Sequence, residues 1–271
     1  MNPIDAIALS TLLPPSLKNL KIECVEETGS TNSDLLEVLR ASPASTPRPI
    51  LRQAAKQSAG RGRLGRPWIN QVQSSLMFSL AWPLQVGLNK LGGLSLACGL
   101  ALAHALTDDV APLSAHRLKL KWPNDILLDG QKMGGILIET LSHQANFSWV
   151  VIGVGINYLH DVQIEAQLGH KTAALVNLRG DMDWSTLLAH LVTALAQQLK
   201  SFEAHGFAPM HDDWQHYDAY LGQNVQIYDG ARCLAQGTVM GVDHLGQLQL
   251  QTISGIISIA AGEVSLRCNS I

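Results

Sequence analysis

The stretch "QSAGRGRLGRPW", residues 57–68, contains the spacing Gly-x-Gly-x-x-Gly between residues 60 and 65. In a dinucleotide-binding fold, this spacing lies between a strand and a helix whose N-terminus meets the pyrophosphate. Here the alternation that follows predicts a strand over 76–82, and no acidic residue that could bind a ribose occurs before Asp108. The loop therefore predicts a fold other than the doubly wound dinucleotide-binding one.

Three arginines, Arg61, Arg63 and Arg66, lie in the same loop. Glycines let backbone N–H groups approach a ligand closely, and arginines bind carboxylate or phosphate groups in a bidentate way. RNA-binding arginine–glycine segments usually form long disordered repeats with interleaved aromatic residues, whereas this is one short loop in an ordered pattern. The loop alone leaves two interpretations open, a site for a small anion and an ordinary basic turn.

The distribution of charge favours the anion site. The formal net charge of −3 gives no reason to expect nucleic acid or a membrane as the partner. Yet the chain has no Asp or Glu from Val38 to Thr107, a stretch that holds the loop arginines and several further basic residues. A buried helix explains the end of this stretch but not the loop. A local positive field on a mildly acidic chain indicates a small anionic ligand.

The hydrophobic pattern predicts an α+β fold. One helix is predicted to begin near Thr31, where Thr31-x-x-Asp34 resembles a capping box, and another covers 187–202 and ends at Gly206. The apolar stretch 91–106 is interrupted by glycines, a serine and a histidine, and it predicts a buried helix rather than a membrane span. Strands are predicted over 49–57, 76–82, 118–122, 136–139 and 149–156, with a Pro/Ser-rich loop over 41–49 and the last strand central in a mixed sheet.

Beyond Gly222 the pattern changes to short alternating strands separated by glycine-containing turns. This pattern is typical of a small β barrel. We therefore predict a lead segment over 1–24, a main domain that bears the site over 25–221, and a C-terminal barrel over 222–271.

The composition is that of a folded, soluble chain. The 271 residues are 46% hydrophobic, which excludes a disordered protein. The four cysteines are scattered without a Cys-x-x-Cys pair, and the first residues lack the basic region of an export signal. We predict a cytoplasmic protein with reduced thiols.

Further short motifs accompany the glycine loop in a fixed order. They are "STN" (30–32), "KWPND" (121–125), "KMGGILIE" (132–139), "GVGIN" (153–157) and "GEVSL" (262–266). Each motif alone is common, but the ordered set strongly resembles the biotin–protein ligases, from about residue 25 to the end of the chain. The resemblance implies a catalytic domain related to the class II aminoacyl-tRNA synthetases, followed by an SH3-like barrel.

The resemblance also implies a two-step reaction. The carboxylate of biotin attacks the α-phosphate of Mg-ATP to give biotinyl-5′-AMP and pyrophosphate. A lysine of a biotin carboxyl carrier protein domain of a biotin-dependent carboxylase then attacks the anhydride and releases AMP. Because the substrates supply both nucleophiles, the protein must supply positioning and positive charge. Mg²⁺ would arrive with ATP, held mostly by the phosphates, and no histidine or cysteine spacing predicts a metal site in the protein.

The resemblance assigns these tasks to particular residues. Lys121 at a strand end would bridge the biotin carboxylate and the α-phosphate, with Arg63 as the second catalytic residue, whereas Lys119 is interpreted as an exposed strand lysine. Gly153 and Gly155 interrupt a buried strand, which indicates a close approach to the backbone, by resemblance that of biotin. Biotin would contact Ser30, Thr31, Asn32, Gln57, Gly60, Arg61, Gly62, Arg63, Lys121, Gly153 and Gly155. ATP would contact Arg61, Arg66, Trp68, Lys121 and Asn157.

Purely structural roles would also explain several of these residues. Ser30 and Thr31 can cap a helix, and Trp68 can belong to the core. Asn124 and Asp125 are expected to shape the turn after the strand rather than bind a metal.

Rival functions also stay open. Some family members repress transcription through an N-terminal winged helix, but only about 25 residues precede the first motif here, so we expect no repressor activity. The alternative enzyme is a lipoate–protein ligase, which shares the fold and the adenylation step. The alternative outside the enzymes is a binding module without catalysis. We expect a monomer or weak homodimer that binds biotin, ATP and the carrier domain, but neither nucleic acid nor a membrane.

Overall fold

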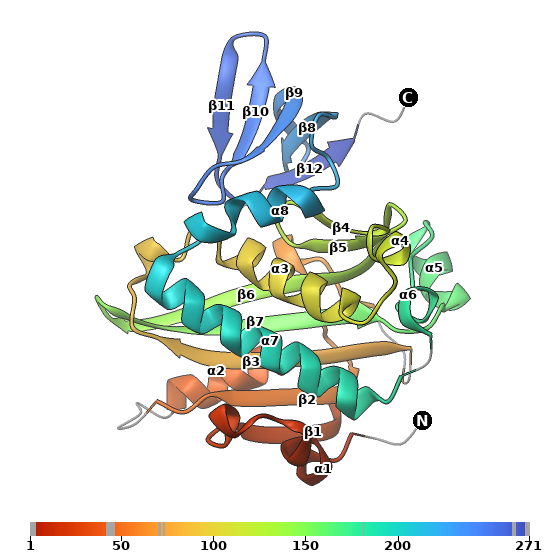
Figure 1. Cartoon of the computed structure of the whole chain (residues 1–271), viewed down its shortest axis with the longest axis vertical. Coiled ribbons are helices and arrows are strands. Elements are labelled where there is room, and N and C mark those ends of the chain that lie inside the picture. Colours follow the sequence, from red (N-terminus) through yellow and green to blue (C-terminus); the bar gives the residue numbers. More distant parts are fainter. Residues whose placement is uncertain are drawn as a thin grey trace.

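The computed structural model describes residues 4–41, 47–69, 72, 74–180, 182–261 and 264–268. Most of the loop predicted over 41–49 and the first two residues of the "GEVSL" motif lie outside these residues. The described chain forms a larger α/β part and a smaller sheet, with helix α8 (His211–Tyr217) between them (Figure 1).

A mixed sheet forms the centre of the larger part, with the strand order β1-β2-β3-β7-β6-β5-β4. Strands β1 and β2 pair in parallel, and the other neighbours in this sheet are antiparallel. The bounds are β1 Lys21–Thr28, β2 Ile50–Gln57, β3 Ser75–Leu84, β4 Leu118–Lys121, β5 Asp125–Leu128, β6 Gln131–Gln144 and β7 Phe147–Asn157. The strand predicted to be central is β7, which lies between β3 and β6, so that prediction is confirmed.

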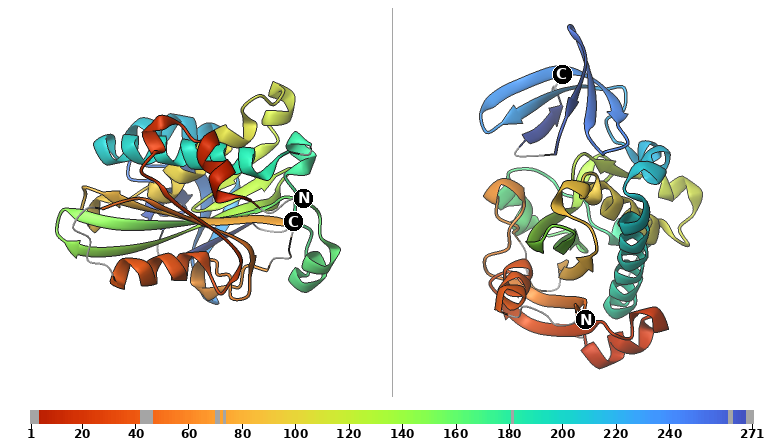
Figure 2. Two further views of the ribbon diagram at one scale, coloured as in Figure 1. Left: turned by 90° about the horizontal axis from the view of Figure 1, so that it is seen from below. Right: turned by 90° about the vertical axis from the view of Figure 1, so that its left-hand side faces the viewer.

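Helices cover both faces of this sheet (Figure 2). Helices α1, α3 and α7 lie on one face and α2 lies on the other. The bounds are α1 Ala6–Leu12, α2 Thr31–Ala41, α3 Leu94–Thr107, α4 Pro112–Ala115, α5 Val162–Leu168, α6 Val176–Arg179 and α7 Trp184–His205. Single 3₁₀ turns occupy Pro15–Leu17, Arg63–Gly65, Leu88–Lys90 and Ala208–Met210. Helix α7 ends at Gly206, whose φ is 67°, as the sequence predicts.

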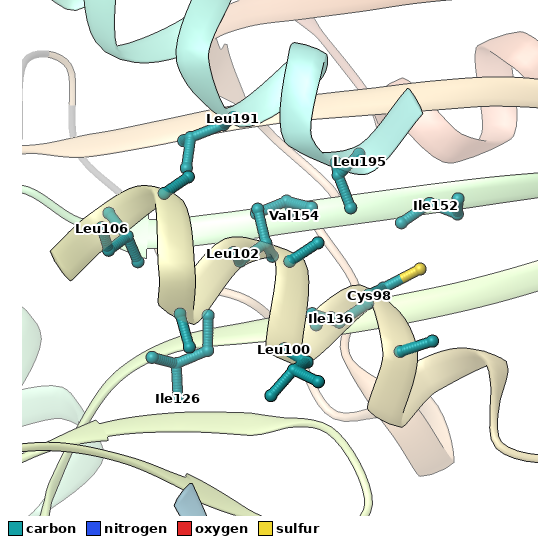
Figure 3. Packing of buried hydrophobic residues seen from close by; sticks show 14 of the residues in the cluster. Cys98, Leu100, Leu102, Leu106, Ile126, Ile136, Ile152, Val154, Leu191 and Leu195 are labelled. Atoms are coloured by element: carbon teal, nitrogen blue, oxygen red, sulfur yellow. The ribbon is translucent and has the colours of Figure 1, made fainter. Parts of the chain in front are cut away.

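The main core lies between the sheet and helices α3 and α7. Helix α3 is apolar all round because it is packed on the sheet from one side and on α7 from the other. Leu102 and Leu106 of α3 lie beside Leu191 and Leu195 of α7 in this layer (Figure 3). The prediction of a buried helix over 91–106 is therefore confirmed, and among the described residues no helix is long and apolar enough to cross a membrane.

Two strand predictions differ from the structure. Strand β4 ends at Lys121, and Trp122 lies in the following turn, where its peptide bond to Pro123 is cis. Strand β6 is much longer than the predicted 136–139 because it pairs with β5 through its first residues and with β7 along most of its length. Glycines and polar side chains in β6 hide this pairing from a local pattern.

The C-terminal part is an antiparallel sheet with the strand order β11-β10-β9-β8-β12. Its bounds are β8 Asn224–Asp229, β9 Arg232–Val242, β10 Leu248–Thr252, β11 Gly255–Ile259 and β12 Val264–Cys268. Buried residues such as Ile227, Val239 and Leu250 belong to the same hydrophobic core as the larger part. A separate set of short strands after Gly222 is confirmed, but no pairing between described residues joins β11 to β12.

Asp218 lies at the junction of the two parts and is 8% exposed. Its Oδ1 accepts a hydrogen bond from the backbone N–H of Tyr220 at 2.9 Å, whereas Oδ2 is buried without a hydrogen-bond partner among the described residues. Burial raises the pKa of Asp218 to about 6, although the Tyr220 N–H and the charge of Lys119 act in the opposite direction. The folded protein therefore binds this proton more tightly than the unfolded chain does.

This linkage predicts that Asp218 makes the wild type less stable as the pH rises from about 4 to about 6. Asp218→Asn keeps the Oδ1 acceptor and removes the titration. We expect the variant to be more stable than the wild type by about 1–3 kcal/mol at pH 8, with a difference that shrinks toward zero at pH 4. Urea unfolding across this range measures the effect, with the exposed Asp108→Asn as the control. Parallel pH profiles of wild type and Asp218→Asn would contradict it.

Candidate active site

A cavity of about 670 Å³ opens between the start of α2, the glycine loop and strands β6 and β7. All but one of the residues predicted to bind biotin or ATP line this cavity. They are Ser30, Thr31, Asn32, Gln57, Arg61, Gly62, Arg63, Arg66, Trp68, Lys121, Gly153, Gly155 and Asn157. Gly60 is the exception: it is buried, and its carbonyl accepts a hydrogen bond from Trp68 N–H at 2.8 Å. A Cβ at Gly60 would lie 3.0 Å from the Trp68 carbonyl oxygen, so this glycine allows the two ends of the loop to approach each other.

The glycine loop connects the antiparallel strands β2 and β3 and is not followed by a helix. This confirms that the loop is not a dinucleotide-binding turn. The loop closes on itself, since Gly62 N–H donates to the Arg66 carbonyl at 2.7 Å and Arg61 forms a bridge with Pro67. Arg66 is exposed at its rim, whereas Arg63 is half-buried beneath it.

A hydrogen-bonded cluster of polar side chains lies at one wall of the cavity, to which it contributes Thr31 and Asn32. We call Thr31, Asn32, Ser79 and Glu139 the polar cluster. The Ser79 hydroxyl donates to Asn32 Oδ1 at 2.5 Å and lies 2.6 Å from the Thr31 hydroxyl. Asn32 Nδ2 donates to Glu139 Oε2 at 2.9 Å. These bonds fix the orientation of the Asn32 amide before any ligand arrives.

The capping box predicted for α2 is wrong. Asp34 does not bond back to the N–H of Thr31; its carboxylate accepts hydrogen bonds from the Thr28 hydroxyl at 2.7 Å and from Arg52 at 3.1 Å. The Thr31 N–H instead donates to Gln57 Oε1 at 2.8 Å, across to strand β2. The Ser30 hydroxyl accepts the N–H of Ser33 at 3.5 Å, as expected of a local cap, so the first turn of α2 is satisfied partly by Ser30 and partly by the tertiary contact with Gln57.

The close approach predicted at the glycines of β7 is present, and protein side chains make it. A Cβ at Gly153 would lie 2.4 Å from Asn32 Oδ1, and a Cβ at Gly155 would lie 2.5 Å from the Trp68 ring. Both glycines therefore leave room for side chains that form the cavity. Their contact with biotin stays a prediction.

Arg61 is engaged by a residue whose role the sequence did not predict. Its Nη2 donates to the Ser33 hydroxyl at 2.9 Å and lies 3.2 Å from Glu139 Oε2. Glu139 lies on β6 and points to the same side as the cavity-lining Leu137, because residues two apart on a strand share a face. A counter-ion for Arg61 thus lies beside the cavity and reduces the attraction of this arginine for an anionic ligand.

Three other cations line the cavity around the turn between β4 and β5. Arg63 donates to Asn124 Oδ1 at 3.3 Å, and burial lowers the pKa of its guanidinium, against the opposing effect of the nearby Asp125 carboxylate. Lys121 ends β4, with its ammonium 5.6 Å from the centre of the Tyr220 ring. Lys132 pairs with Asp125 at 2.6 Å. Clustered cations beside a single acid produce a positive potential suited to carboxylate and phosphate groups.

Lys132 is a second residue that sequence reasoning missed, although it opens the "KMGGILIE" motif. Its ammonium lies 5.8 Å from the centre of the Trp68 ring, within the range of a cation–π contact. Lys119, by contrast, donates to the His216 carbonyl at 2.8 Å and does not line the cavity. The predicted distinction between Lys119 and Lys121 agrees with this placement.

The segment 161–172 forms a further wall of the cavity. Its sequence contains no motif that predicted a site. Helix α5 is capped by Asp161 and ends at Gly169, and the segment after it returns through Thr172, whose N–H donates to Glu165 at 2.9 Å. Ile164 and Thr172 line the cavity. Asn157 lies nearby at the end of β7 and is buried, with its carbonyl accepting from the N–H of Leu175 at 2.8 Å.

Asn124 has the structural role predicted for it. Its Nδ2 donates to the Ile136 carbonyl at 3.0 Å, and its own carbonyl accepts the N–H of Ile136 at 3.0 Å. Within the described part of the chain, no three His, Cys, Asp or Glu side chains gather in a way that could hold a metal ion.

Comparison with known families gives two matches along the chain. Residues 25–157 match the model of the Biotin/lipoate A/B protein ligase family, and residues 220–267 match that of the Biotin protein ligase C terminal domain. The two matches cover most of the residues that line the cavity, but not those of the segment 161–172.

Individual relatives agree with these matches. The bifunctional ligase/repressor BirA of Escherichia coli is 33% identical over 79% of this chain, which spans 65% of the length of that relative. The biotin–[acetyl-CoA-carboxylase] ligase of Paracoccus denitrificans is 32% identical over 88% of this chain and 97% of its own length. The biotin protein ligase from Aquifex aeolicus in complex with biotin and ATP superposes with a TM-score of 0.74 at 27% identity, over 92% of this chain and 99% of that one.

Proposed function

This chain belongs to the biotin protein ligase family, and we propose that it activates biotin with ATP and transfers it to a carrier protein. The intermediate would be biotinyl-5′-AMP, and the acceptor would be a lysine of a biotin carboxyl carrier protein domain. The observation that carries this proposal is one cavity whose lining is divided between neutral polar side chains, such as Thr31, Asn32 and Gln57, and cations, such as Lys121, Arg63 and Lys132. Biotin has the same division, with a neutral ureido ring and a carboxylate.

The cations suit the first step because two negative groups must meet in it. The biotin carboxylate attacks the α-phosphate, a bond to the bridging oxygen breaks, and pyrophosphate leaves. Lys121 would bridge the carboxylate and the α-phosphate, Arg63 would stabilise the charge on the phosphate, and Arg66 at the rim would meet the leaving phosphates. Charges held in place before the reaction lower the barrier without reorganisation.

The neutral polar side chains at the start of α2 suit the ureido ring. Ser30, Thr31 and Asn32 are 5%, 3% and 3% exposed and present their polar atoms to the cavity from fixed positions. A neutral ring requires donors and acceptors rather than charge, and a buried site that pairs them strongly rejects a ligand that lacks them. The volume of about 670 Å³ is also within the usual range for small-molecule sites.

We infer several finer features together with this function. The main domain would be related to the class II aminoacyl-tRNA synthetases, the C-terminal sheet would close as an SH3-like barrel, and the boundary would lie near residue 221. Mg²⁺ would be held mainly by the ATP phosphates, since Asn124 and Asp125 are already engaged within the protein. We further expect a cytoplasmic protein, a monomer or weak homodimer, that binds no nucleic acid.

Biotin-dependent exchange of labelled pyrophosphate into ATP tests the proposal, with lipoate as a parallel substrate. Exchange that requires biotin supports the proposed adenylation. Exchange with lipoate alone would keep the adenylation mechanism but make lipoate the substrate. No exchange with either compound would mean that the protein binds its ligand without catalysis. Transfer of label from biotin to an added carrier domain tests the second step.

Lys132→Ala provides a prediction on the ATP end of the cavity. The variant removes a cation and leaves the Asp125 carboxylate without that partner, so both changes disfavour bound phosphates. We expect kcat/KM for ATP to fall by about tenfold or more. Adding Asp125→Asn to Lys132→Ala should recover part of this loss. A kcat/KM within twofold of the wild type would show that Lys132 does not act on ATP.

A further inference from the structure

The chain that joins the two parts of the fold runs along the open edge of β4. Leu120 forms an isolated parallel bridge with Asp218, and the N–H of Ala219 donates to the Leu120 carbonyl at 2.8 Å. Strand β4 is the last strand of the sheet, so this segment covers an edge that would otherwise be open. Figure 1 shows β4 lying next to α8, from which the segment starts. The backbone before Lys121 is therefore held from both sides.

The same segment brings an aromatic ring to Lys121. Tyr220 lines the cavity, and the ammonium of Lys121 lies 5.6 Å from the centre of its ring. The N–H of Tyr220 donates to the buried carboxylate of Asp218, which fixes the turn that carries the ring. On the other side of Lys121, the indole N–H of Trp122 donates to the Gly246 carbonyl at 3.1 Å. Hydrogen bonds thus hold the residues on either side of Lys121, and its ammonium faces the Tyr220 ring.

We propose that Tyr220 is a positioning residue for Lys121 and that its ring face holds the ammonium at the reacting end of the cavity. A lysine has a long flexible side chain, and an ammonium above an aromatic face is attracted by the negative face of the ring. An ammonium that is held in place in advance does not have to be ordered during the reaction. The catalytic consequence rests on the proposed function, whereas the placement of the ammonium does not.

A double-mutant cycle tests the catalytic consequence. Tyr220→Leu is expected to lower kcat of biotin-dependent exchange by about tenfold, with little change in KM for biotin. Tyr220→Phe keeps the ring and should retain the wild-type rate. In a Lys121→Ala background, Tyr220→Leu should change the rate by less than about twofold, because the group that it positions is already absent. Tyr217→Leu, three residues earlier in the same junction, serves as the control for loosened packing.

Chemical labelling tests the placement without any catalytic activity. Reductive methylation of Lys121 by formaldehyde and borohydride is followed by mass spectrometry, with Lys119 as the internal reference. Tyr220→Leu should raise the labelling rate of Lys121 by about threefold or more, while Tyr220→Phe and Tyr217→Leu leave it unchanged.

The two experiments distinguish the positioning role of Tyr220 from the proposed function. If labelling of Lys121 is the same in every variant, or if Tyr220→Leu lowers exchange equally in both backgrounds, the positioning role is overturned. If labelling changes as expected but the wild type shows no biotin-dependent exchange, the positioning of the ammonium stands and the proposed function fails.

Discussion

Replacing Lys121 with alanine is expected to lower biotin-dependent pyrophosphate exchange by about 10²–10³-fold, the usual loss on removing one charge contact to a transition state. The effect should appear mainly in kcat, since the bridging ammonium is most needed when the carboxylate and the α-phosphate approach each other. Binding of biotin alone, measured by calorimetry, should change much less.

Lys119→Ala is the matched control for this experiment. Lys119 precedes Lys121 by two residues on the same strand, but its ammonium donates to the His216 carbonyl and does not line the cavity. We expect its exchange rate to stay within about threefold of the wild type. Equal losses in the two variants would show that general positive charge on β4, rather than the placement of Lys121, supports the reaction.

Gly153→Ala is expected to weaken biotin binding by about 30- to 100-fold and to lower the free energy of unfolding by about 2–4 kcal/mol. The added methyl group would lie 2.4 Å from Asn32 Oδ1. Asn32 cannot give way freely, because Ser79, Glu139 and the Leu137 carbonyl all bond to its amide. Displacing it would leave buried polar groups without partners. Calorimetric titration with biotin and urea unfolding measure the two effects.

The same substitution in an Asn32→Ala background makes the prediction for Gly153→Ala specific. Asn32→Ala removes the side chain that the new methyl group would strike, so adding Gly153→Ala to it should change stability by less than about 0.5 kcal/mol. If Gly153→Ala is equally costly with and without Asn32, the clash lies elsewhere and the assigned role of Gly153 is wrong.

The residues that the sequence identified in the cavity share one property: their motifs are short and local. The glycine loop could be separated from a dinucleotide-binding turn because the next element is visibly a strand. Lys121 could be assigned a direction because it ends an alternating run. For the loop, the deciding information lies within a few residues, where the periodicity of strands and the geometry of glycine act. The choice of Lys121 over Lys119 depended on the resemblance of the whole set of motifs to the biotin–protein ligases.

The missed residues depend on contacts between distant parts of the chain. Glu139 acts through Asn32 and Arg61, which are 107 and 78 residues away in the sequence. Lys132, for which the sequence predicted no separate role, lies over the ring of Trp68 from a distant part of the chain. The capping box failed for the same reason, since Gln57 from β2 replaces the local partner of Thr31. Local rules give way where tertiary contacts offer a better partner.

The polar cluster also has a consequence for how the protein acquires its binding competence. Its members come from α2, β3 and β6, and the pairing of β3 with β7 joins segments about 70 residues apart. Contacts this distant carry a large loop-closure entropy and tend to form late in folding. A partly folded chain can hold the local β4–β5–β6 hairpins yet lack a place for the ligand. Under the proposed function, we therefore expect biotin to bind only the completed domain and, by mass action, to stabilise the whole sheet rather than the glycine loop alone.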